Sequence, residues 1–444
     1  MKSLDEIKNE ILELTKEYTR IESAEADSYR IGDRINYAGR VYDESERINL
    51  IDSALDFFLT AGKYANEFED KLSKFLDIPY AFAVNSGSSA NLLAFAALTS
   101  PLLESKRINR GDEIITVAMG FPTTVSPIVQ LGCVPVFVDV TIPSYNIDVS
   151  KLKDALSSKT KAVFVAHTLG VPFDLKAVAE FCKDNDLFLI EDNCDALGAE
   201  YDIGDGYFKT GTFGDIGTSS FYPAHHITMG EGGAVYTKNP LLAKILVSLR
   251  DWGRDCVCPP SKDDTCNRRF TGQFGSLPVG YDHKYVYSHL GYNLKVTDMQ
   301  AAVGCAQLDK LPKFIEKRRE NWRLLRDAFQ DLSEWLTLPE EEPNSRHSPF
   351  GLVVTLKENS PISRNQLAII LESKGVQTRN LFAGNITRHP CFDSLLEGTD
   401  YHISGELKET DRVMNNTLWI GVYPGLMKEQ ISEMIDAFMF AFGK

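Results

Sequence analysis

Short apolar segments that alternate with helical stretches limit the fold of this chain more than any other feature. The apolar segments are residues 81–84, 114–117, 135–138, 162–165 and 187–190, and helical stretches such as 88–98 and 175–182 lie between them. Buried strands joined by crossover helices predict an α/β fold with a largely parallel sheet covered on both faces. Ligands of such sheets bind at the carboxyl ends of the strands, so we expect the functional residues there.

The rest of the chain predicts an N-terminal extension and a second, smaller domain. Residues 1–50 are charged and partly helical, which suits an extension, and residues 51–335 would form the large domain. A long helical stretch follows Asp298, and the Pro-rich residues 338–343 come after it. We place the domain boundary there, because residues 336–444 alternate strand, helix, strand and helix, as a small C-terminal α+β domain would.

The charge of the chain bears on its partners. The 444 residues include 47 basic and 62 acidic side chains, a formal net charge of −15. Since no basic surplus exists to neutralise phosphates, no nucleic-acid partner is expected, although a local basic pocket would still bind a nucleotide. The first residues are charged, and no apolar run approaches the length of a membrane span. We therefore predict a cytoplasmic protein without a membrane-spanning segment.

A turn rich in serine and glycine follows the first apolar segment. Residues 85–90 read Asn-Ser-Gly-Ser-Ser-Ala and join the strand at 81–84 to the next helix. Free amides at a helix N-terminus bind phosphate, and Gly87 and Ser88 stand at that position. A serine at 86 or 88 would serve equally well as an ordinary N-cap. The turn by itself leaves both interpretations open.

An aromatic residue and an acidic pair follow two other predicted strands. Phe121 comes shortly after 114–117, and Glu191 and Asp192 come directly after 187–190. In isolation, a phenylalanine is usually a core residue and an acidic strand end is often a helix cap. Their places at the carboxyl ends of predicted strands nevertheless make them candidates for the site.

The stretch 220–233 contains Ser-Phe, three residues, His225, His226 and a later Gly-Glu-Gly-Gly. This stretch resembles the cofactor loop of the DegT/DnrJ-type sugar aminotransferases, in which a lysine stands where His225 does here. The resemblance runs from about residue 62 to 302 and implies the aminotransferase-like fold of pyridoxal phosphate (PLP) enzymes, the aspartate aminotransferase fold. An imidazole cannot form the covalent bond by which a lysine amine holds PLP. The resemblance therefore implies a site without the tether, in which His225 is a catalytic proton carrier.

The resemblance also implies how the cofactor, which would be pyridoxamine 5′-phosphate (PMP), is bound. Gly87, Ser88 and Ser220 match positions that hold the cofactor phosphate in relatives. Phe121 matches the aromatic residue that stacks on the pyridine ring. Asp192 matches the aspartate that pairs with the protonated pyridine nitrogen and keeps the ring an electron sink.

Two further matches concern the edges of the site. Asp195 stands where relatives carry a polar side chain near the ring oxygen of the cofactor. Asn293, within Gly-Tyr-Asn at 291–293, matches an asparagine that reaches the phosphate bound by the neighbouring subunit, which implies a homodimer with shared active sites. Arg388 is a candidate for the pyrophosphate of a nucleotide, although a solvated arginine is an equally good interpretation.

Three of the eight cysteines, Cys256, Cys258 and Cys266, are close together in a polar loop near residues 251–270. The cysteines that lie singly, and that we expect to be structural, are Cys133, Cys182, Cys305 and Cys391. Clustered thiolates in a reducing compartment indicate a metal, either zinc or an iron–sulfur cluster, and the spacing does not separate the two. The fourth ligand favours the cluster, because Cys194, two residues beyond Asp192, would place an electron relay beside the cofactor ring.

Histidine at the lysine position and this cysteine pattern together resemble one branch of the family, the PMP- and 2Fe–2S-dependent sugar-nucleotide 3-dehydrases. That resemblance implies removal of the 3-hydroxyl of CDP-4-keto-6-deoxy-D-glucose, on the route to the 3,6-dideoxyhexoses of lipopolysaccharide O-antigen. It implies that a 2Fe–2S cluster is held by Cys194, Cys256, Cys258 and Cys266. It also implies an NADH-dependent flavin/iron–sulfur reductase as the partner that delivers electrons.

Two alternatives stay open. The first is a cluster-free PMP-dependent 3-dehydratase that is regenerated by glutamate, with zinc or nothing on the cysteines. The second is a non-catalytic cofactor-binding regulator that kept the fold and lost the lysine. The retention of Asp192, His225 and the cysteines argues against a regulator, because a site without activity needs none of them.

Overall fold

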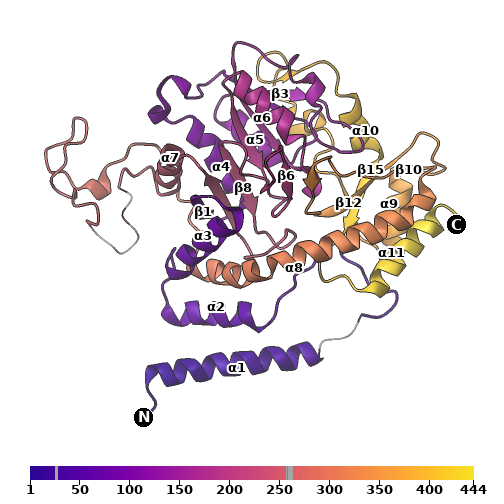
Figure 1. Ribbon diagram of the computed structural model, residues 1–444, viewed down its shortest axis with the longest axis horizontal. Helices are drawn as coiled ribbons and strands as arrows, with labels where there is room; N and C mark the ends of the chain where they lie inside the picture. Colours follow the sequence, from indigo (N-terminus) through magenta and orange to yellow (C-terminus); the bar gives the residue numbers. More distant parts are fainter. Residues whose placement is uncertain (26–28, 257, 259–263) are drawn as a thin grey trace.

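The computed structural model describes residues 1–25, 29–256, 258 and 264–444 of the chain. Within these residues, the centre of the molecule is an eight-stranded sheet with the strand order β1-β9-β8-β5-β4-β2-β3-β14 (Figure 1). Neighbouring strands are parallel from β8 through β5, β4, β2 and β3 to β14, and antiparallel where β9 joins β8 and β1. The predicted α/β fold with a largely parallel sheet is confirmed.

The strands expected from the sequence all lie in this sheet. They are β1 (Tyr80–Val84), β2 (Glu113–Val117), β3 (Val134–Val138), β4 (Thr160–Ala166) and β5 (Phe188–Asp192). The sheet also contains β8 (Ile216–Ser220), β9 (Gly233–Thr237) and β14 (His402–Ile403). The stretch that carries His225 is therefore the connection between the antiparallel strands β8 and β9.

Helices cover both faces of the sheet, as the packing of β4 shows. Ala162 and Phe164 pack with α4 (Gly87–Leu98) and α7 (Pro240–Arg250), whereas Val163 and Val165 pack with α6 (Leu175–Asp184). Successive side chains of a strand point to opposite faces, so a uniformly apolar strand requires a cover on each side. The remaining helices of this region are α3 (Lys63–Leu76) and α5 (Pro122–Gln130).

A second, antiparallel sheet lies beyond the long helix α8 (Asp298–Ala328), which runs from the large sheet to the smaller one (Figure 1). Its strands, in spatial order, are β10 (Leu336–Thr337), β12 (Gly351–Leu356), β15 (Thr417–Gly421) and β13 (Thr378–Asn380). The helices near it are α9 (Arg364–Ser373), α10 (Lys408–Asn416) and α11 (Lys428–Ala441). A third, three-stranded sheet contains β6 (Glu200–Asp202), β7 (Tyr207–Lys209) and β11 (Ser345–Arg346). We call the four-stranded sheet of β10, β12, β15 and β13 the small sheet.

The N-terminal part contains α1 (Leu4–Glu25) and α2 (Glu44–Asp56), and α1 lies along the outside of α2 (Figure 1). Between these helices the chain reaches the small sheet, where Ile35 forms a β-bridge with Val376. The division into residues 1–50, 51–335 and 336–444 stays a prediction. Two features cross it, since α2 extends past residue 50 and β14 joins the large sheet. Among the described helices, none is long and apolar enough to pass through a membrane.

Candidate active site

A cavity of about 500 Å³ opens at the carboxyl ends of β4 and β5. The residues predicted for the site that line it are Gly87, Ser88, Phe121, Asp192, Cys194, Asp195, Ser220 and His225. These residues come from elements far apart in the sequence, and the parallel sheet brings them to one edge. The structure therefore gathers the predicted catalytic and cofactor residues other than Asn293 around one cavity, where the strand pattern led us to expect them.

The turn before α4 is built for the close approach of two chain segments. Ser86 caps the helix by accepting a hydrogen bond from the Ser89 amide at 3.0 Å, so the predicted N-cap exists. The amides of Gly87 and Ser88, at the first two helical positions, have no acceptor within the helix. A Cβ on Gly87 would lie 2.4 Å from the Cβ of Ser220, so only glycine fits there. Cap and anion site are thus compatible, and the hydroxyl of Ser220 lies beside the free amides.

Asp192 is a buried carboxylate with fixed orientation. Its Oδ2 accepts hydrogen bonds from Asn91 Nδ2 at 2.8 Å and Thr124 Oγ1 at 2.7 Å, and its Oδ1 accepts one from the Cys194 amide at 3.2 Å. Asn91 is held in turn by the hydroxyl of Thr218 at 2.7 Å. Three donors hold the carboxylate rigidly at the cavity wall, where it can pair with a cation such as a protonated pyridine nitrogen.

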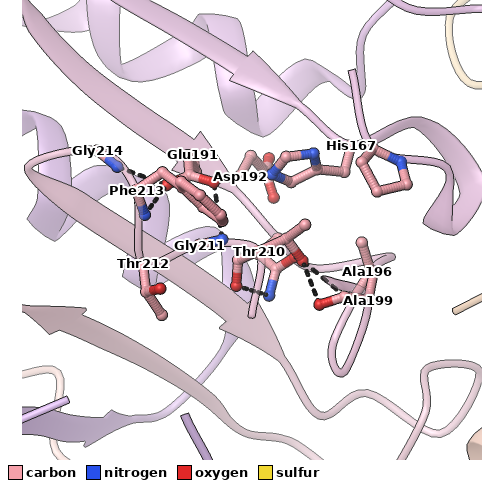
Figure 2. A network of polar contacts seen from close by, with 12 residues as sticks. His167, Glu191, Asp192, Ala196, Ala199, Thr210, Gly211, Thr212, Phe213 and Gly214 are labelled. Carbon is pink, nitrogen blue, oxygen red and sulfur yellow. Dashed lines mark hydrogen bonds and ion pairs between the residues drawn. The ribbon is translucent and has the colours of Figure 1, made fainter. Parts of the chain in front are cut away.

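Glu191, the neighbour of Asp192, points to the other face of the sheet, as alternation along a strand requires. Its carboxylate is fully buried and accepts hydrogen bonds from the amides of Gly211, Phe213 and Gly214 at 2.6–2.8 Å (Figure 2). His167 Nε2 lies 3.0 Å from the same carboxylate. The two acidic residues at the end of β5 therefore have different roles: Asp192 faces the cavity, and Glu191 binds the backbone of the turn at 211–214.

His225 lies at the cavity wall, and two neighbours orient its imidazole. Nδ1 is 3.4 Å from Oδ1 of Asp195, an ion-pair distance, and Nδ1 has no hydrogen-bond partner among the described residues. The ring of Phe350 packs against the imidazole with 5.1 Å between centroids. Burial raises the pKa of Asp195 above its usual 3.8, and the nearby His225 opposes this shift. Because Nδ1 faces Asp195, Nε2 is the nitrogen left for a ligand.

Arg318, on α8, fastens the His225 loop from behind. Its guanidinium is buried and donates to the carbonyl oxygens of His225 at 2.9 Å and Phe350 at 3.2 Å. Longer contacts reach the carbonyl oxygens of Ala224 and Pro349. Burial lowers the pKa of Arg318 to about 9. The sequence analysis missed this residue, because nothing in the helical pattern of α8 distinguishes a buried arginine from a solvated one.

His226 has a different place from His225. It is buried, and its Nε2 donates to the carbonyl oxygen of Ser348 at 2.9 Å. Burial lowers the pKa of His226 well below its usual value, so its imidazole is neutral. It does not line the cavity that His225 lines. His226 thus packs the loop, and His225 is the member of the pair that faces the site.

The C-terminal part of the chain and the segment before α2 supply cavity residues that the sequence analysis missed. They are Tyr37, Phe350, Arg379, Asn380, Phe382, His389, Cys391 and Trp419. Cys391 is exposed, whereas Cys133, Cys182 and Cys305 are buried, and the structural role expected of these four cysteines stays a prediction. Arg388 does not line the cavity and forms a two-point ion pair with Asp411, with Nε 2.6 Å from Oδ1.

The four predicted metal ligands are not all gathered in one place. Cys194 lines the cavity and none of the three loop cysteines does. Burial and the carboxylates of Asp192 and Asp195 raise the pKa of Cys194 well above its usual value, which disfavours a thiolate. In the described part of the chain, no group of three or more His, Cys, Asp or Glu side chains is arranged to hold a metal ion. Residues 257 and 259–263 of the predicted iron–sulfur loop lie outside the described residues.

The loop cysteines nevertheless have specific neighbours, namely one another and a histidine. The thiols of Cys256 and Cys266 interact with that of Cys258. Cys266 Sγ lies 3.6 Å from Nδ1 of His283, whose Nε2 lies 2.8 Å from an oxygen of Asp255. His283 is a further residue that the sequence analysis missed, because it follows Cys266 by 17 residues and is not part of a short ligand motif.

Asn293 lies outside the cavity of its own chain. Its side chain is exposed and accepts a hydrogen bond from Lys295 Nζ at 2.7 Å. An exposed position is what a residue that reaches into a neighbouring subunit would have. Its role at a subunit interface stays a prediction.

Comparisons with known proteins agree with this geometry. The chain is 52% identical over 406 residues to the lipopolysaccharide biosynthesis protein RfbH of Salmonella typhimurium, covering 91% of each chain. It is 47% identical over 431 residues to the dTDP-4-dehydro-2,6-dideoxy-D-glucose 3-dehydratase of Saccharopolyspora spinosa, covering 97% of this chain and 91% of that one. A structure of Escherichia coli GDP-4-keto-6-deoxy-D-mannose-3-dehydratase with bound hydrated PLP matches with a TM-score of 0.80, 29% identity, and coverage of 91% and 99%.

Another structure shows GDP-4-keto-6-deoxymannose-3-dehydratase with a trapped PLP-glutamate geminal diamine. It matches with a TM-score of 0.79 and 29% identity, and covers 92% of this chain and 100% of that one. The family model of the DegT/DnrJ/EryC1/StrS aminotransferases matches residues 42–439, nearly the whole chain. With this match and relatives of 52% and 47% identity, the chain belongs to the DegT/DnrJ/EryC1/StrS aminotransferase family.

Proposed function

We propose that this chain is a PMP-dependent sugar-nucleotide 3-dehydratase of lipopolysaccharide or deoxysugar biosynthesis. The observation that carries the proposal is His225 at the lysine position of an otherwise complete cofactor cavity. The relatives named as sugar 3-dehydratases support the reaction type. A regulator without activity is disfavoured, because Asp192 and His225 are both oriented by specific neighbours at the cavity.

The residues present fit the cofactor. The free amides of Gly87 and Ser88, next to the hydroxyl of Ser220, suit its phosphate, and only a glycine permits their approach. Asp192 suits the protonated pyridine nitrogen, and Phe121 lies at the cavity where it can cover the ring. When bound, PMP supplies an amine that condenses with a 4-keto group and a conjugated ring that accepts electrons when a proton is removed.

The role of His225 is to move a proton. Asp195 faces Nδ1, which leaves Nε2 to accept and carry a proton at the cavity, where a bound cofactor and substrate would present the carbon to be deprotonated. Arg318 holds the backbone of the loop by its carbonyl groups, so the imidazole keeps its place without a covalent link. Phe350 packs against the ring and keeps water from one of its sides.

The finer assignments go beyond the reaction type. We propose CDP-4-keto-6-deoxy-D-glucose as the substrate and a 2Fe–2S cluster on Cys194, Cys256, Cys258 and Cys266, reduced by an NADH-dependent flavin/iron–sulfur reductase. The spacing of the cysteines and the nearness of Cys194 to Asp192 support the cluster. The separation of Cys194 from the loop cysteines argues against the cluster. The residues as placed do not fit it, and no step of the reaction is assigned to it.

Two further assignments complete the proposal. The exposed Asn293 supports a homodimer in which each subunit helps to hold the other's cofactor. A reaction on a sugar nucleotide is in keeping with a cytoplasmic enzyme.

The second candidate is the cluster-free enzyme regenerated by glutamate. The related structure with a trapped PLP-glutamate geminal diamine favours it, as does the absence of a metal-holding group among the described residues. In this case the cysteines of the loop would be structural or would bind zinc.

The test is turnover of CDP-4-keto-6-deoxy-D-glucose under anaerobic conditions, with glutamate alone or with a flavin/iron–sulfur reductase and NADH. Mass spectrometry of the product should show loss of the 3-hydroxyl. Activity only with the reductase supports the cluster, and activity with glutamate alone supports the second candidate. A 4-amino sugar as the product would contradict both, because it would show an aminotransferase. GDP-4-keto-6-deoxy-D-mannose in a parallel reaction tests the choice of nucleotide and sugar.

A further inference from the structure

We propose that Arg379 binds the diphosphate of the nucleoside-diphosphate sugar, an assignment that rests on the proposed function. Arg379 belongs to β13, in the small sheet, and lines the cavity that also contains Asp192 and His225. Of the residues that line this cavity in the described part of the chain, Arg379 alone is an arginine or lysine. A guanidinium is the side chain best suited to a diphosphate, because its forked donors match two phosphate oxygens.

The charge of Arg379 is not neutralised by a carboxylate. In the described part of the chain its guanidinium donates to the carbonyl oxygen of Thr378 at 2.8 Å and lies over the ring of Tyr37, 4.1 Å from the centroid. It takes part in no ion pair with a described residue, and its side chain is exposed. The other arginine considered for this role, Arg388, is already paired with Asp411 on two oxygens. An exposed, positioned and unpaired cation is free to bind an anion.

The surrounding charges make such a cation necessary. The chain has a net charge of −15, and the cavity lining adds the carboxylates of Asp192 and Asp195. A diphosphate brings further negative charge to this cavity, so without a compensating group the substrate would be repelled. The cofactor phosphate has its own place at the N-terminus of α4, which leaves Arg379 for the substrate.

A line of aromatic contacts connects Arg379 to the catalytic histidine. The ring of His225 packs on Phe350 at 5.1 Å, Phe350 on Trp419 at 5.2 Å, and Trp419 on Tyr37 at 5.3 Å. Tyr37 then lies under Arg379. In a nucleoside-diphosphate sugar the diphosphate is attached at C1, across the hexose ring from C3 and C4. Binding at Arg379 would therefore direct the reacting carbons along this wall toward His225.

This arrangement also gives the segment before α2 a function. Tyr37 comes from residues 29–43, which the structure places against the small sheet, and Trp419 packs edge-on against it with 87° between the ring planes. Stacking on a tyrosine restricts the guanidinium before the ligand arrives, so less conformational freedom is lost on binding. Tyr37 is thus a positioning residue for Arg379.

The experiment measures binding of CDP and of cytidine to the full-length, PMP-loaded protein by isothermal titration calorimetry. The variants are Arg379→Ala, Arg379→Lys and, as a matched control, Arg388→Ala. We expect Arg379→Ala to weaken CDP binding by about 10- to 100-fold, since charge-assisted hydrogen bonds to phosphate are lost. Cytidine binding should not change. Arg379→Lys should be intermediate, because an ammonium keeps the charge and loses the fork.

Steady-state kinetics gives a second readout. Arg379→Ala should raise KM and leave kcat close to the wild-type value, because the residue contacts the nucleotide and not the reacting carbons. The assignment is overturned if Arg379→Ala binds CDP within about twofold of the wild type, or if Arg388→Ala shows the larger loss. GDP and dTDP are titrated in the same way, and the assignment is also overturned if the wild type binds none of the three diphosphates.

Failure of the proposed function looks different. If diphosphate binding depends on Arg379 but the reaction product is a 4-amino sugar, the binding assignment stands and the dehydratase assignment falls. Circular dichroism of each variant confirms that a change in affinity comes from the site and not from unfolding.

Discussion

His225 Nδ1 and Asp195 Oδ1 lie 3.4 Å apart at the cavity wall, and both side chains are nearly buried. In the proposed reaction this pair determines which imidazole nitrogen faces the substrate: Asp195 faces Nδ1, and Nε2 is left for the proton. A lysine at this position would have one amine for both the covalent bond and the proton. In the proposed site, Asp195 instead orients the base His225, and the cofactor is held separately by Asp192 and the turn at residues 85–90.

Replacing Asp195 by Asn tests the pair. Burial raises the pKa of Asp195 above 3.8, so its carboxylate is less favourable in the folded state than in the unfolded chain. Its contribution to stability is present below pH 3.8 and is lost as the pH rises through the folded pKa. Asp195→Asn, which does not titrate, should therefore melt at a higher temperature than the wild type at pH 7, with a smaller difference near pH 4. Its kcat should fall about tenfold or more, because the imidazole loses its orienting partner.

The melting temperature of the cofactor-free protein is measured at several pH values, and kcat is measured at pH 7. The control is Asp205→Asn, because Asp205 is exposed and its carboxylate pays no burial penalty. A less stable Asp195→Asn variant at pH 7 would contradict the buried-carboxylate interpretation.

Arg318→Met tests how the loop is held without a covalent bond. Methionine fills a similar space but leaves the carbonyl oxygens of His225 and Phe350 unpaired in a buried place. We expect a loss of about 2–4 kcal/mol in unfolding free energy, measured by urea denaturation. PMP affinity should change little, whereas kcat should fall. Lys317→Met, at a partly exposed position of α8, is the control. If both variants lose the same stability and the same kcat, Arg318 has no special role in holding the loop.

His226→Asn separates packing from chemistry. The Nε2 of His226 donates to the carbonyl oxygen of Ser348 in a buried place, and the shorter asparagine cannot make the same contact. The variant should lose about 1–3 kcal/mol of stability. Its kcat, measured well below its melting temperature, should stay within about threefold of the wild type. A loss of turnover with unchanged stability would instead make His226 the catalytic member of the pair.

The metal content tests the cysteines. If Cys194, Cys256, Cys258 and Cys266 hold 2Fe–2S, each Cys→Ser variant of anaerobically purified protein should contain less iron and sulfide, with PMP binding intact. Cys133→Ser, Cys182→Ser and Cys305→Ser are the controls, since these thiols are buried and are not predicted ligands. Cys391 is unsuited as a control because it lines the cavity. Zinc in place of iron, or iron that is retained after Cys194→Ser, would overturn the four-cysteine cluster.

The sequence predicted the parts of the site that follow from the strand pattern. Apolar segments such as β4 and β5 allowed only a sheet covered on both faces, and this put the turn at residues 85–90 and Asp192 at one edge. The pattern also misjudged details: Glu191 and Asp192 belong to β5 itself, so alternation along the strand directs only Asp192 into the cavity.

The rest depends on contacts between distant parts of the chain. Tyr37 and Arg379 carry no local pattern, and they meet because Ile35, before α2, forms a β-bridge with Val376, two residues before β13. Arg388 was the candidate that the sequence suggested for the pyrophosphate, and its pairing with Asp411 is decided by how α10 packs. Local periodicity reports burial and secondary structure, and it does not report which of two arginines keeps a free charge.

The most direct test of the account is His225→Asn in a single turnover with PMP-loaded protein and CDP-4-keto-6-deoxy-D-glucose. Asparagine keeps a polar side chain of similar reach and cannot serve as a base. The account predicts that PMP binds with the wild-type affinity, because no covalent bond is lost, and that removal of the 3-hydroxyl, followed by mass spectrometry, slows by about 100-fold or more. Removal of the 3-hydroxyl at a rate near that of the wild type would contradict the account.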